Sequence, residues 1–354
     1  MLVQIDKLQK IVSLAGTAPS FLRDYFFGVP AYYPNGEINI EIEKNGQQVA
    51  PFVAPEIGGK VMERLGSKIK TFTAPEVAPQ RVITTKNLLA AAGNDQVVFI
   101  EAGSTPETRQ ADLIKKDFMD NEDAITRREE LMCGEALFKG QVTVTGDGYG
   151  TQVIKFWDDA DKPYSELTGA ALWTAATADP VADIEFGISQ TQNRSGITAN
   201  DVIMSPKTWQ LARKNEGLLK QLDTKNLDVG EILGQNVANA MGVRLVARLA
   251  GANIWTYSKT LKVQQADGTI VDTPVVPDGL VLFGSKSVPT EMAYGVVSIT
   301  DVKNQTLRHS TGRRVVNQYL SNKNPAGIVN ETKCAPLPVP KVPDGFYVLK
   351  VTTP

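Results

Sequence analysis

The longest regular pattern in the chain predicts one uninterrupted helix from Ser104 to Phe138. Apolar residues recur there at intervals of three, four and seven, the spacing of one narrow stripe on a helix: Ala111, Ile114, Phe118, Ile125, Met132 and Ala136. Ser104 with Pro106 and Glu107 fits a helix start, and Gly140 fits its end. About 34 residues would span roughly 50 Å. Such a rod is more typical of proteins that tile a surface than of enzymes.

The face opposite this stripe carries charged residues, and we expect it to lie in solvent. These residues are Lys115, Lys116, Glu122, Arg127, Arg128, Glu129 and Glu130. Glu129 and Glu130 are adjacent, so their side chains diverge on a helix. The pattern predicts surface charge here, not a catalytic carboxylate pair.

Before the helix, the pattern predicts a long β-hairpin. Ile38, Ile40 and Ile42 alternate with polar residues, which indicates a half-buried strand that ends at the turn signal Asn45-Gly46. The strand-like runs at 59–62 and 69–72 that follow are rich in charge and interrupted by prolines. A charged hairpin that cannot bury itself is expected to find its partner on another chain.

Large apolar residues also gather near the N-terminus, in the segment Phe21-Leu22-Arg23-Asp24-Tyr25-Phe26-Phe27. These side chains must be buried somewhere. They could form an arm over a neighbouring surface, or they could pack on their own domain. The residues alone leave both alternatives open.

After the helix, a loop-rich linker over 158–182 leads to a second, α/β lobe that we expect to begin near Asp183. Ser205-Pro206 predicts a helix start after a short strand. The expected elements of the lobe are a strand at Val202–Met204, a helix through Trp209 to Ala212, a helix at Val229–Met241, and strands at Asn253–Tyr257, Leu261–Gln265, Thr269–Pro274 and Val281–Phe283. Beyond Arg314 the chain is rich in proline and ends on a strand-like run, Phe346–Val351.

Composition narrows the class of protein. With 354 residues the chain can fold as two or three lobes, and its 42% hydrophobic and 21% charged residues are ordinary for a globular protein. No apolar run approaches about 18 residues, so we expect no membrane span. The first 14 residues do not resemble a signal peptide, and the only cysteines are Cys133 and Cys334; a cytosolic, reduced origin fits best. A net charge of −2 argues against strong binding of nucleic acid.

The candidate chemistry is sparse. His309 is the only histidine, so we expect no metal site and no cofactor. It precedes Ser310 in a segment with Arg308, Arg313 and Arg314, which we interpret as solvated or ion-paired between chains, because no G-x-S-x-G motif accompanies it. Gly58-Gly59-Lys60 lacks the earlier glycine and the following Ser or Thr of a phosphate loop. We therefore expect no enzyme.

The order of these parts, and short motifs within them, are similar to the major capsid proteins of tailed bacteriophages, in particular the lambda-type branch. The motifs that carry the resemblance are Phe21-Leu22-Arg23 with Phe26-Phe27; Phe52-Val53-Ala54-Pro55 with Gly59 and Val61; Phe72-Thr73-Ala74-Pro75; Leu137-Phe138-Lys139-Gly140 with Thr143 and Thr145-Gly146; Pro206-Lys207 with Trp209 and Leu211; Leu219-Lys220 with Leu222-Asp223; Asn324-Pro325-Ala326; and Ala335-Pro336-Leu337. They extend over almost the whole chain.

The resemblance implies an α+β, Hong Kong-97-like capsid fold. Its parts would be an N-terminal arm at 1–45, an extended loop with a strand of the peripheral domain at 46–100, a spine helix with peripheral β-segments at 101–182, an axial domain at 183–300, and a return to the peripheral domain at 301–354. Copies would assemble as hexamers and pentamers of an icosahedral shell around double-stranded DNA that is not bound by sequence.

The resemblance also implies partner proteins and a location for the protein. We expect a separate scaffolding protein, a portal protein, a possible decoration protein, and a location in the virion after assembly in the host cytoplasm. Contacts between copies are expected at Phe21, Leu22, Arg23, Phe26, Phe27, Phe52, Lys60, Arg64, Lys68, Lys70 and Phe72. The alternatives are an encapsulin-like nanocompartment shell and, more remotely, a cytosolic hydrolase that uses Ser310 and His309.

Overall fold

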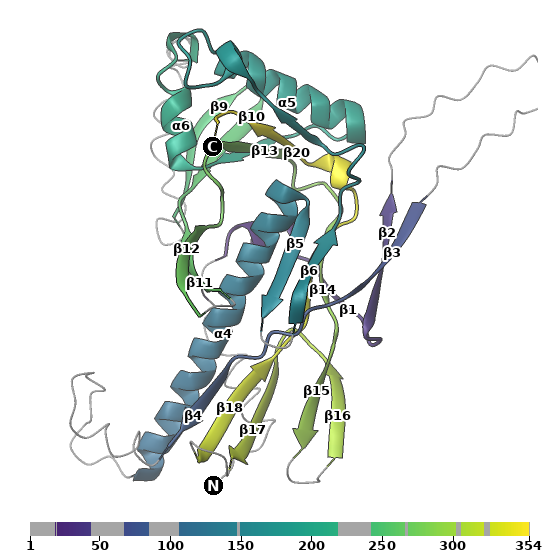
Figure 1. Ribbon diagram of the computed structural model, residues 1–354, viewed down its shortest axis with the longest axis vertical. Helices are drawn as coiled ribbons and strands as arrows, with labels where there is room; N and C mark the ends of the chain where they lie inside the picture. Colours follow the sequence, from purple (N-terminus) through teal and green to yellow (C-terminus); the bar gives the residue numbers. More distant parts are fainter. Residues whose placement is uncertain are drawn as a thin grey trace, which may run out of the picture.

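The fold is organised around one long helix, α4 (Pro106–Lys139), which runs from one end of the molecule to a lobe at the other (Figure 1). The computed structural model describes residues 18, 20–43, 67–84, 106–146, 149–218, 242–265, 268–301, 306–321 and 326–353. Helices and several small sheets are mixed along the chain, so the predicted α+β class is confirmed. The 34-residue α4 confirms the predicted rod, whereas its predicted cap, Ser104, lies outside the described residues.

The first half of α4 is covered by an antiparallel sheet of β17 (Val315–Ser321), β18 (Gly327–Lys333) and β4 (Gln80–Ile83). Ile114 and Phe118 of the helix stripe pack there against Ile83 and Val316. β4 comes from a part of the chain that is far in sequence from β17 and β18. The helix therefore ties the extended-loop region to the closing segment.

The second half of α4 faces a sheet of β1 (Pro30–Tyr32), β14 (Thr290–Tyr294) and β19 (Pro336–Pro340) and the hairpin of β5 (Gln141–Gly146) and β6 (Tyr149–Lys155). Met132 and Ala136 of the stripe lie in this core. In β19 every second residue is a proline, paired with Thr290, Met292 and Tyr294 across β14. Proline has no backbone N–H, so the outer edge of β19 is closed to a further strand.

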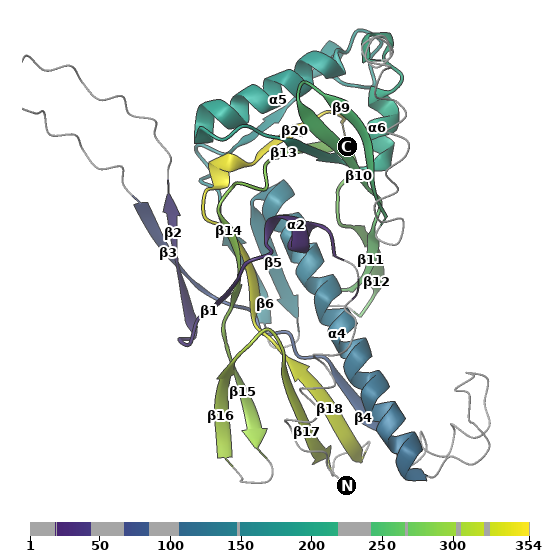
Figure 2. The same cartoon turned by 180° about the vertical axis from the view of Figure 1, so that it is seen from behind.

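Three hairpins extend from this framework. The first is a ribbon of β2 (Glu37–Glu43) and β3 (Ser67–Thr73), which projects away from the rest of the molecule in both views (Figures 1 and 2). The second, of β15 (Val296–Asp301) and β16 (Thr306–Thr311), lies beside the sheet of β17. The third, of β11 (Thr260–Gln264) and β12 (Ile270–Pro274), descends from the lobe beside α4.

The lobe contains a six-stranded sheet with the order β7-β20-β13-β8-β10-β9. Its strands are β7 (Tyr164–Glu166), β8 (Asp201–Met204), β9 (Val243–Leu249), β10 (Ala252–Tyr257), β13 (Leu280–Gly284) and β20 (Tyr347–Lys350). It is packed against α5 (Pro180–Ser195) and α6 (Pro206–Ala212). Ser205 caps α6 by accepting a hydrogen bond from the backbone N–H of Thr208, as its sequence predicts.

The segment boundaries predicted for the lobe need correction. β20 pairs with β13 and β7 pairs with β20, so residues on both sides of 183–300 belong to the lobe sheet. Conversely, β14 and β15 lie within that range but join other sheets. The range 158–182 is no simple linker either, because it holds β7, the 3-10 turn η1 (Gly169–Ala171) and the start of α5. The expected helix at 229–241 and the tip of the extended hairpin lie outside the described residues.

Gly140, at the end of α4, is a position where only glycine fits. Its φ is +63°, and an added Cβ would lie 1.9 Å from Cδ2 of Trp157. We expect Gly140→Ala to lower the free energy of unfolding by at least ~1 kcal/mol, measured by denaturant unfolding of the unassembled protein. Gly36→Ala, where a Cβ meets nothing within 4 Å, should leave it nearly unchanged. Equal stability of the two variants would contradict this account.

Candidate functional site: a buried charge network on the long helix

Four polar side chains of α4 share one face of the helix: Glu122, Thr126, Glu129 and Glu130. Their spacing of four, seven and eight residues from Glu122 places them in successive turns. All four are buried, with exposed fractions of 3%, 0%, 0% and 0%. The expectation that these glutamates face solvent is wrong, because segments from both ends of the chain cover them.

Glu130 holds the N-terminal segment against α4. Its Oε1 accepts hydrogen bonds from the backbone N–H groups of Phe21 and Leu22, both at 2.9 Å, and its Oε2 accepts one from Arg23 at 3.0 Å. These N–H groups form the amino end of the short helix α2 (Leu22–Phe26), whose own N-cap side chain makes no such bond. A carboxylate is favoured at that end because the unpaired N–H groups carry partial positive charge. The Tyr257 hydroxyl donates a fourth hydrogen bond to Glu130, to Oε1 at 2.7 Å.

Arg23 forms the second link between this segment and α4. Its Nη1 donates to Glu129 Oε2 at 2.9 Å, while its Nε donates to Asp24 Oδ1 at 2.8 Å. The Arg23 side chain is only 5% exposed. Burial alone would lower the pKa of the Arg23 guanidinium, but Glu129 and Asp24 raise it above its ordinary value. The side chain therefore stays charged.

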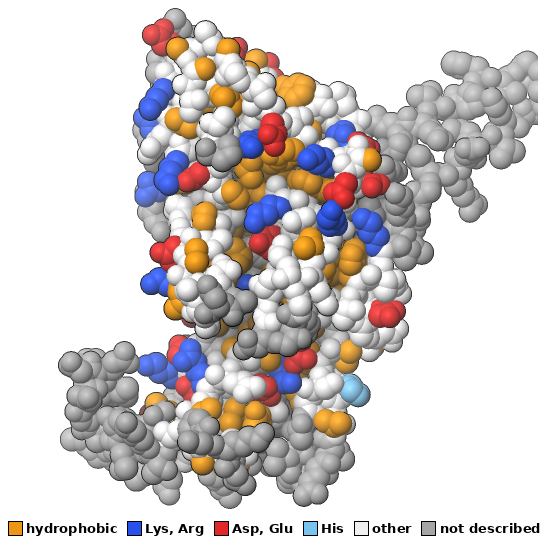
Figure 3. Space-filling view, viewed as in Figure 1, with side chains coloured by type: hydrophobic (Ala, Val, Ile, Leu, Met, Phe, Trp, Pro, Cys, Tyr) orange, Lys and Arg blue, Asp and Glu red, His pale blue; other side chains and the backbone are white. Residues whose placement is uncertain are grey.

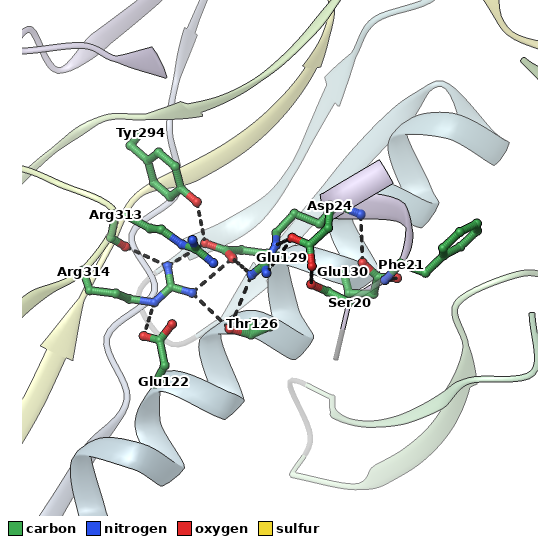
Figure 4. A network of polar contacts seen from close by, with 11 residues as sticks. Ser20, Phe21, Asp24, Glu122, Thr126, Glu129, Glu130, Tyr294, Arg313 and Arg314 are labelled. Atoms are coloured by element: carbon green, nitrogen blue, oxygen red, sulfur yellow. Dashed lines mark hydrogen bonds and ion pairs between the residues drawn. The ribbon is translucent and has the colours of Figure 1, made fainter. Parts of the chain in front are cut away.

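Arg314 reaches the same face of α4 from the start of the closing segment (Figure 4). Its Nη1 donates to Glu129 Oε1 at 2.7 Å and its Nη2 donates to Glu129 Oε2 at 3.1 Å, which makes the contact bidentate. Its Nε donates to Glu122 Oε2. Thr126 Oγ1 accepts a further bond from Nη2 at 3.2 Å. Although burial opposes it, the two carboxylates raise the pKa of Arg314. Arg314 is thus no part of a solvated segment, which corrects the prediction for it.

Glu129 is the centre of the network. It contacts both arginines and also accepts a hydrogen bond from the Tyr294 hydroxyl at 3.1 Å. Burial alone would raise the pKa of Glu129, but the hydrogen bonds and charges of Arg314 and Arg23 lower it. Burial, together with the neighbouring glutamates, raises the pKa of the hydroxyls of Tyr257 and Tyr294, so both act as neutral donors. The network joins the N-terminal segment, α4, β14 and the start of β17.

The lowered pKa of Glu129 predicts a sensitivity to acid. A carboxyl group whose pKa is lower in the folded state contributes stability at pH values above its unfolded pKa of about 4.3, and this stability is lost as the pH falls through the folded value. We expect the free energy of unfolding of the unassembled protein to fall over that interval, measured by urea unfolding. In the Glu129→Gln variant the free energy of unfolding should lack the part of this pH dependence that comes from Glu129. The same slope in both proteins would contradict this assignment.

Near the N-terminus, most of the residues that were predicted to contact other copies are buried within their own chain. Phe21, Leu22, Phe26 and Phe27 belong to the main core of their own chain. Phe21 lies 5.7 Å from the ring of Tyr257, and Phe26 lies 5.4 Å from that of Phe346. The second alternative, packing on the same domain, therefore holds for this segment. The contacts with other copies that were expected at these side chains are replaced by contacts within their own chain, and Glu130 anchors the backbone that carries them.

The other predicted contact residues belong to the extended hairpin. Phe52, Lys60 and Arg64 lie outside the described residues. Lys68 is in β3. Lys70, in the same strand, donates from Nζ to the carbonyl oxygen of Lys155 at 3.2 Å, and Phe72 packs against Phe156 with ring centroids 6.0 Å apart. The last two attach the base of the ribbon to the body of the molecule.

The residues weighed for catalysis or metal binding make no such site in the described part of the chain. His309 is exposed on β16, where its Nδ1 lies 2.9 Å from the Ser298 hydroxyl of the facing strand. Cys133 and Cys334 are buried free thiols. Among the described residues no cluster of three potential metal ligands occurs, and no helix of that part is long and apolar enough to cross a membrane.

Sequence reasoning missed the network because each of its members has an ordinary surface explanation. A signal was present: Glu122, Thr126, Glu129 and Glu130 repeat on one helical face. The partners of Glu122 and Glu129 are two arginines. Yet Arg23 and Arg314 lie 106 and 185 residues from Glu129. Nothing local in the sequence shows that they meet.

A family model and several known proteins match most of this chain. The family model described as "Phage major capsid protein E" matches residues 5–351. The chain is 23% identical over 310 residues to the major capsid protein of Escherichia phage lambda, covering 86% of this chain and 85% of that protein. It is 22% identical over 331 residues to the major capsid protein of Enterobacteria phage P21, covering 93% of each.

Solved structures agree at the level of the fold. A protein described as a prophage capsid protein of E. coli CFT073 superposes with a TM-score of 0.69 at 17% identity, over 99% of this chain and 100% of that one. A phage-related protein from Bordetella bronchiseptica RB50 superposes with a TM-score of 0.54 at 12% identity, over 98% and 96% of the two chains.

Proposed function

This chain belongs to the phage major capsid protein E family, and from that premise we propose that its copies form hexamers and pentamers of an icosahedral shell around double-stranded DNA. The protein is a structural component of the phage head, not an enzyme. The observation that carries the proposal is the family match, which spans residues 5–351 and so includes every element described above.

The projecting ribbon of β2 and β3 supports contact between copies. Within its described residues, the ribbon is attached to the body at its base, where Ile38 is buried and Phe72 meets Phe156. Its two strands pair with each other alone among the described residues, from Glu37 opposite Thr73 to Glu43 opposite Ser67. An isolated two-stranded ribbon is marginally stable in water. We propose that it lies against a neighbouring copy, with Lys68 on that contact.

The parts of the chain take different positions in the proposed shell. The lobe of the six-stranded sheet would stand at the centre of each hexamer or pentamer. The sheets along α4 would form the periphery. The bounds of these domains follow the sheets, so β7 and β20 go with the lobe. Obligate interfaces bury roughly 2,000–5,000 Å², and a shell can divide such an area among several neighbours.

The proposed partners are those of shell assembly. A separate scaffolding protein, a portal protein and, where the phage encodes one, a decoration protein would act with this chain in the host cytoplasm, and the finished shell is part of the virion. The DNA would be enclosed without recognition of its sequence, in keeping with a net charge of −2. The phage relatives do not favour an encapsulin-like nanocompartment.

Negative-stain images and a sedimentation profile of the purified protein test the proposal. We expect large closed particles, alone or with the scaffolding protein of the same phage. Small particles only, under all conditions of salt and scaffold, would refute shell formation.

Shortening the ribbon tests how copies meet. We expect a variant with a short Gly/Ser linker in place of residues 41–69 to fold, because Ile38 and Phe72 keep the base in place. Its far-UV circular dichroism and unfolding midpoint should stay close to those of the parent chain, while closed particles disappear from the sedimentation profile. A folded variant that still assembles normally would remove the ribbon from the copy-to-copy contact, without affecting the family assignment.

A further inference from the structure

A hollow of about 320 Å³ opens where α4 ends, between β6, β7 and the start of β13. Aromatic side chains, lysines and carboxylates line it. On this face of the molecule, exposed hydrophobic side chains lie among basic and acidic ones just below the lobe (Figure 3). The volume is at the lower end of the range for ligand sites, about 300–1,000 Å³.

The aromatic part of the lining is the ring of Trp157, the platform, with Tyr164 beside it. The two ring centroids lie 6.5 Å apart and the ring planes are inclined by 43°. Gly140 has no side chain, which lets the indole of Trp157 sit against the end of α4. The backbone N–H groups of Phe156 and Trp157 donate to the carbonyl oxygen of Gly140 at 2.8 and 3.3 Å. Both rings line the hollow and are only partly buried, so part of the Trp157 ring is accessible to a planar ligand.

Three exposed lysines surround the platform: Lys139, Lys155 and Lys162. Nζ of Lys162 lies 4.9 Å from the centroid of the Tyr164 ring. Lys155 is held by Asp159 at 2.7 Å and Lys139 by Glu135 at 3.4 Å. Because these ammonium groups are on flexible stems, each can turn to a phosphate beside the platform.

Two carboxylates of the same lining, Asp159 and Glu166, add hydrogen-bond acceptors. Glu166 is already oriented, since it accepts from the Tyr164 hydroxyl at 2.7 Å and from Lys350 Nζ at 3.3 Å. A carboxylate oxygen can accept a second bond from an exocyclic amino group.

We propose that this hollow binds an unpaired nucleotide, with the base stacked on Trp157 beside Tyr164 and the phosphate at Lys162 and its neighbouring lysines. Stacking on aromatic side chains together with basic groups along the backbone is the general mode of single-strand binding. A duplex fits poorly, because its bases are already stacked on each other. The inference goes beyond shell formation and does not depend on it.

The carboxylates give the site a preference among bases. Cytosine, adenine and guanine carry exocyclic amino groups that can donate to Asp159 or Glu166, and thymine carries none. The site should therefore hold cytosine more tightly than thymine.

Fluorescence anisotropy of a short labelled oligo-dC, titrated with the full-length chain at low salt, tests the site. We expect Trp157→Ala to weaken binding about tenfold, and Trp157→Phe to stay within about threefold of the parent, because phenylalanine still stacks. Lys162→Ala should weaken binding about threefold or more. Lys214→Ala, an exposed lysine on the lobe, is the matched control and should change nothing. Oligo-dT should bind less tightly than oligo-dC.

Competition separates the two sources of such a nucleotide. Displacement of the labelled strand by cytidine monophosphate assigns the site to a free nucleotide, and failure to displace it assigns the site to a strand. The proposal is overturned if Lys162→Ala and a correctly folded Trp157→Ala bind as the parent does, or if duplex DNA competes as well as the single strand.

Discussion

Replacing Glu129 by alanine should lower the free energy of unfolding of the unassembled protein by about 3–5 kcal/mol. The reason is the pair of guanidinium groups that would remain. Arg23 and Arg314 both contact Glu129, and their side chains are only 5% and 7% exposed. Removing the shared partner leaves two buried positive charges with too little compensation. Urea unfolding followed by circular dichroism measures the change.

A matched substitution separates this effect from the change in helix propensity and from the loss of an ordinary glutamate. Glu185 lies exposed on α5, and Glu185→Ala should shift the free energy of unfolding by no more than about 0.5 kcal/mol. Replacing Glu122, Glu129, Arg23 and Arg314 together by apolar residues of similar size should restore part of the loss, since a buried ion network can be exchanged for packing. A Glu129→Ala protein as stable as Glu185→Ala would show that the network carries no stability.

The rod helix could be predicted because its signal is local. The stripe from Ile114 to Ala136 and the glycine after Lys139 lie within one stretch of sequence, and the structure confirms both. The short strand β8 and the cap at Ser205 were predictable for the same reason. Helix α5 was missed although its signal is local too: Asp179 caps it and Gly196, with a φ of 74°, ends it.

The arrangement of the sheets could not be predicted, because it depends on pairings between distant segments. β20 at the end of the chain pairs with β13, and β4 pairs with β18. Alternation of residues indicates which face of a strand is buried, but not which strand lies beside it. The lobe boundaries expected at residues 183 and 300 were wrong for this reason.

The buried network shows a second limit of sequence reasoning. Glutamate and arginine are almost never fully buried unless they are paired, so a solvent-exposed face was the reasonable expectation for Glu129 and Glu130. The structure reverses it by bringing Arg23 and Arg314 to the same point. The same contacts decide the alternative left open for the segment 21–27, whose apolar side chains Phe21, Leu22, Phe26 and Phe27 complete the core of their own chain.

Replacing Glu130 by alanine is the second change expected to have a large effect. Three backbone N–H groups, of Phe21, Leu22 and Arg23, and the Tyr257 hydroxyl would lose their acceptor together. Each buried donor left unpaired costs about 1–3 kcal/mol, and water entering the space offsets part of it. We expect the free energy of unfolding to fall by about 3–5 kcal/mol. The amides of residues 21–23 should also lose protection in hydrogen exchange far more than those of α5.

The local readout distinguishes anchoring of α2 from a general loss of stability. Tyr257→Phe removes one donor and leaves the three backbone bonds to Glu130 in place, so residues 21–23 should keep their protection. In the double variant the effect of Tyr257→Phe should shrink, because the two groups share one hydrogen bond. If Glu130→Ala exposes residues 21–23 no more than it exposes α5, the carboxylate is not what fastens the N-terminal segment to the long helix. In that case the apolar contacts of Phe21, Leu22 and Phe26 would hold the segment without it.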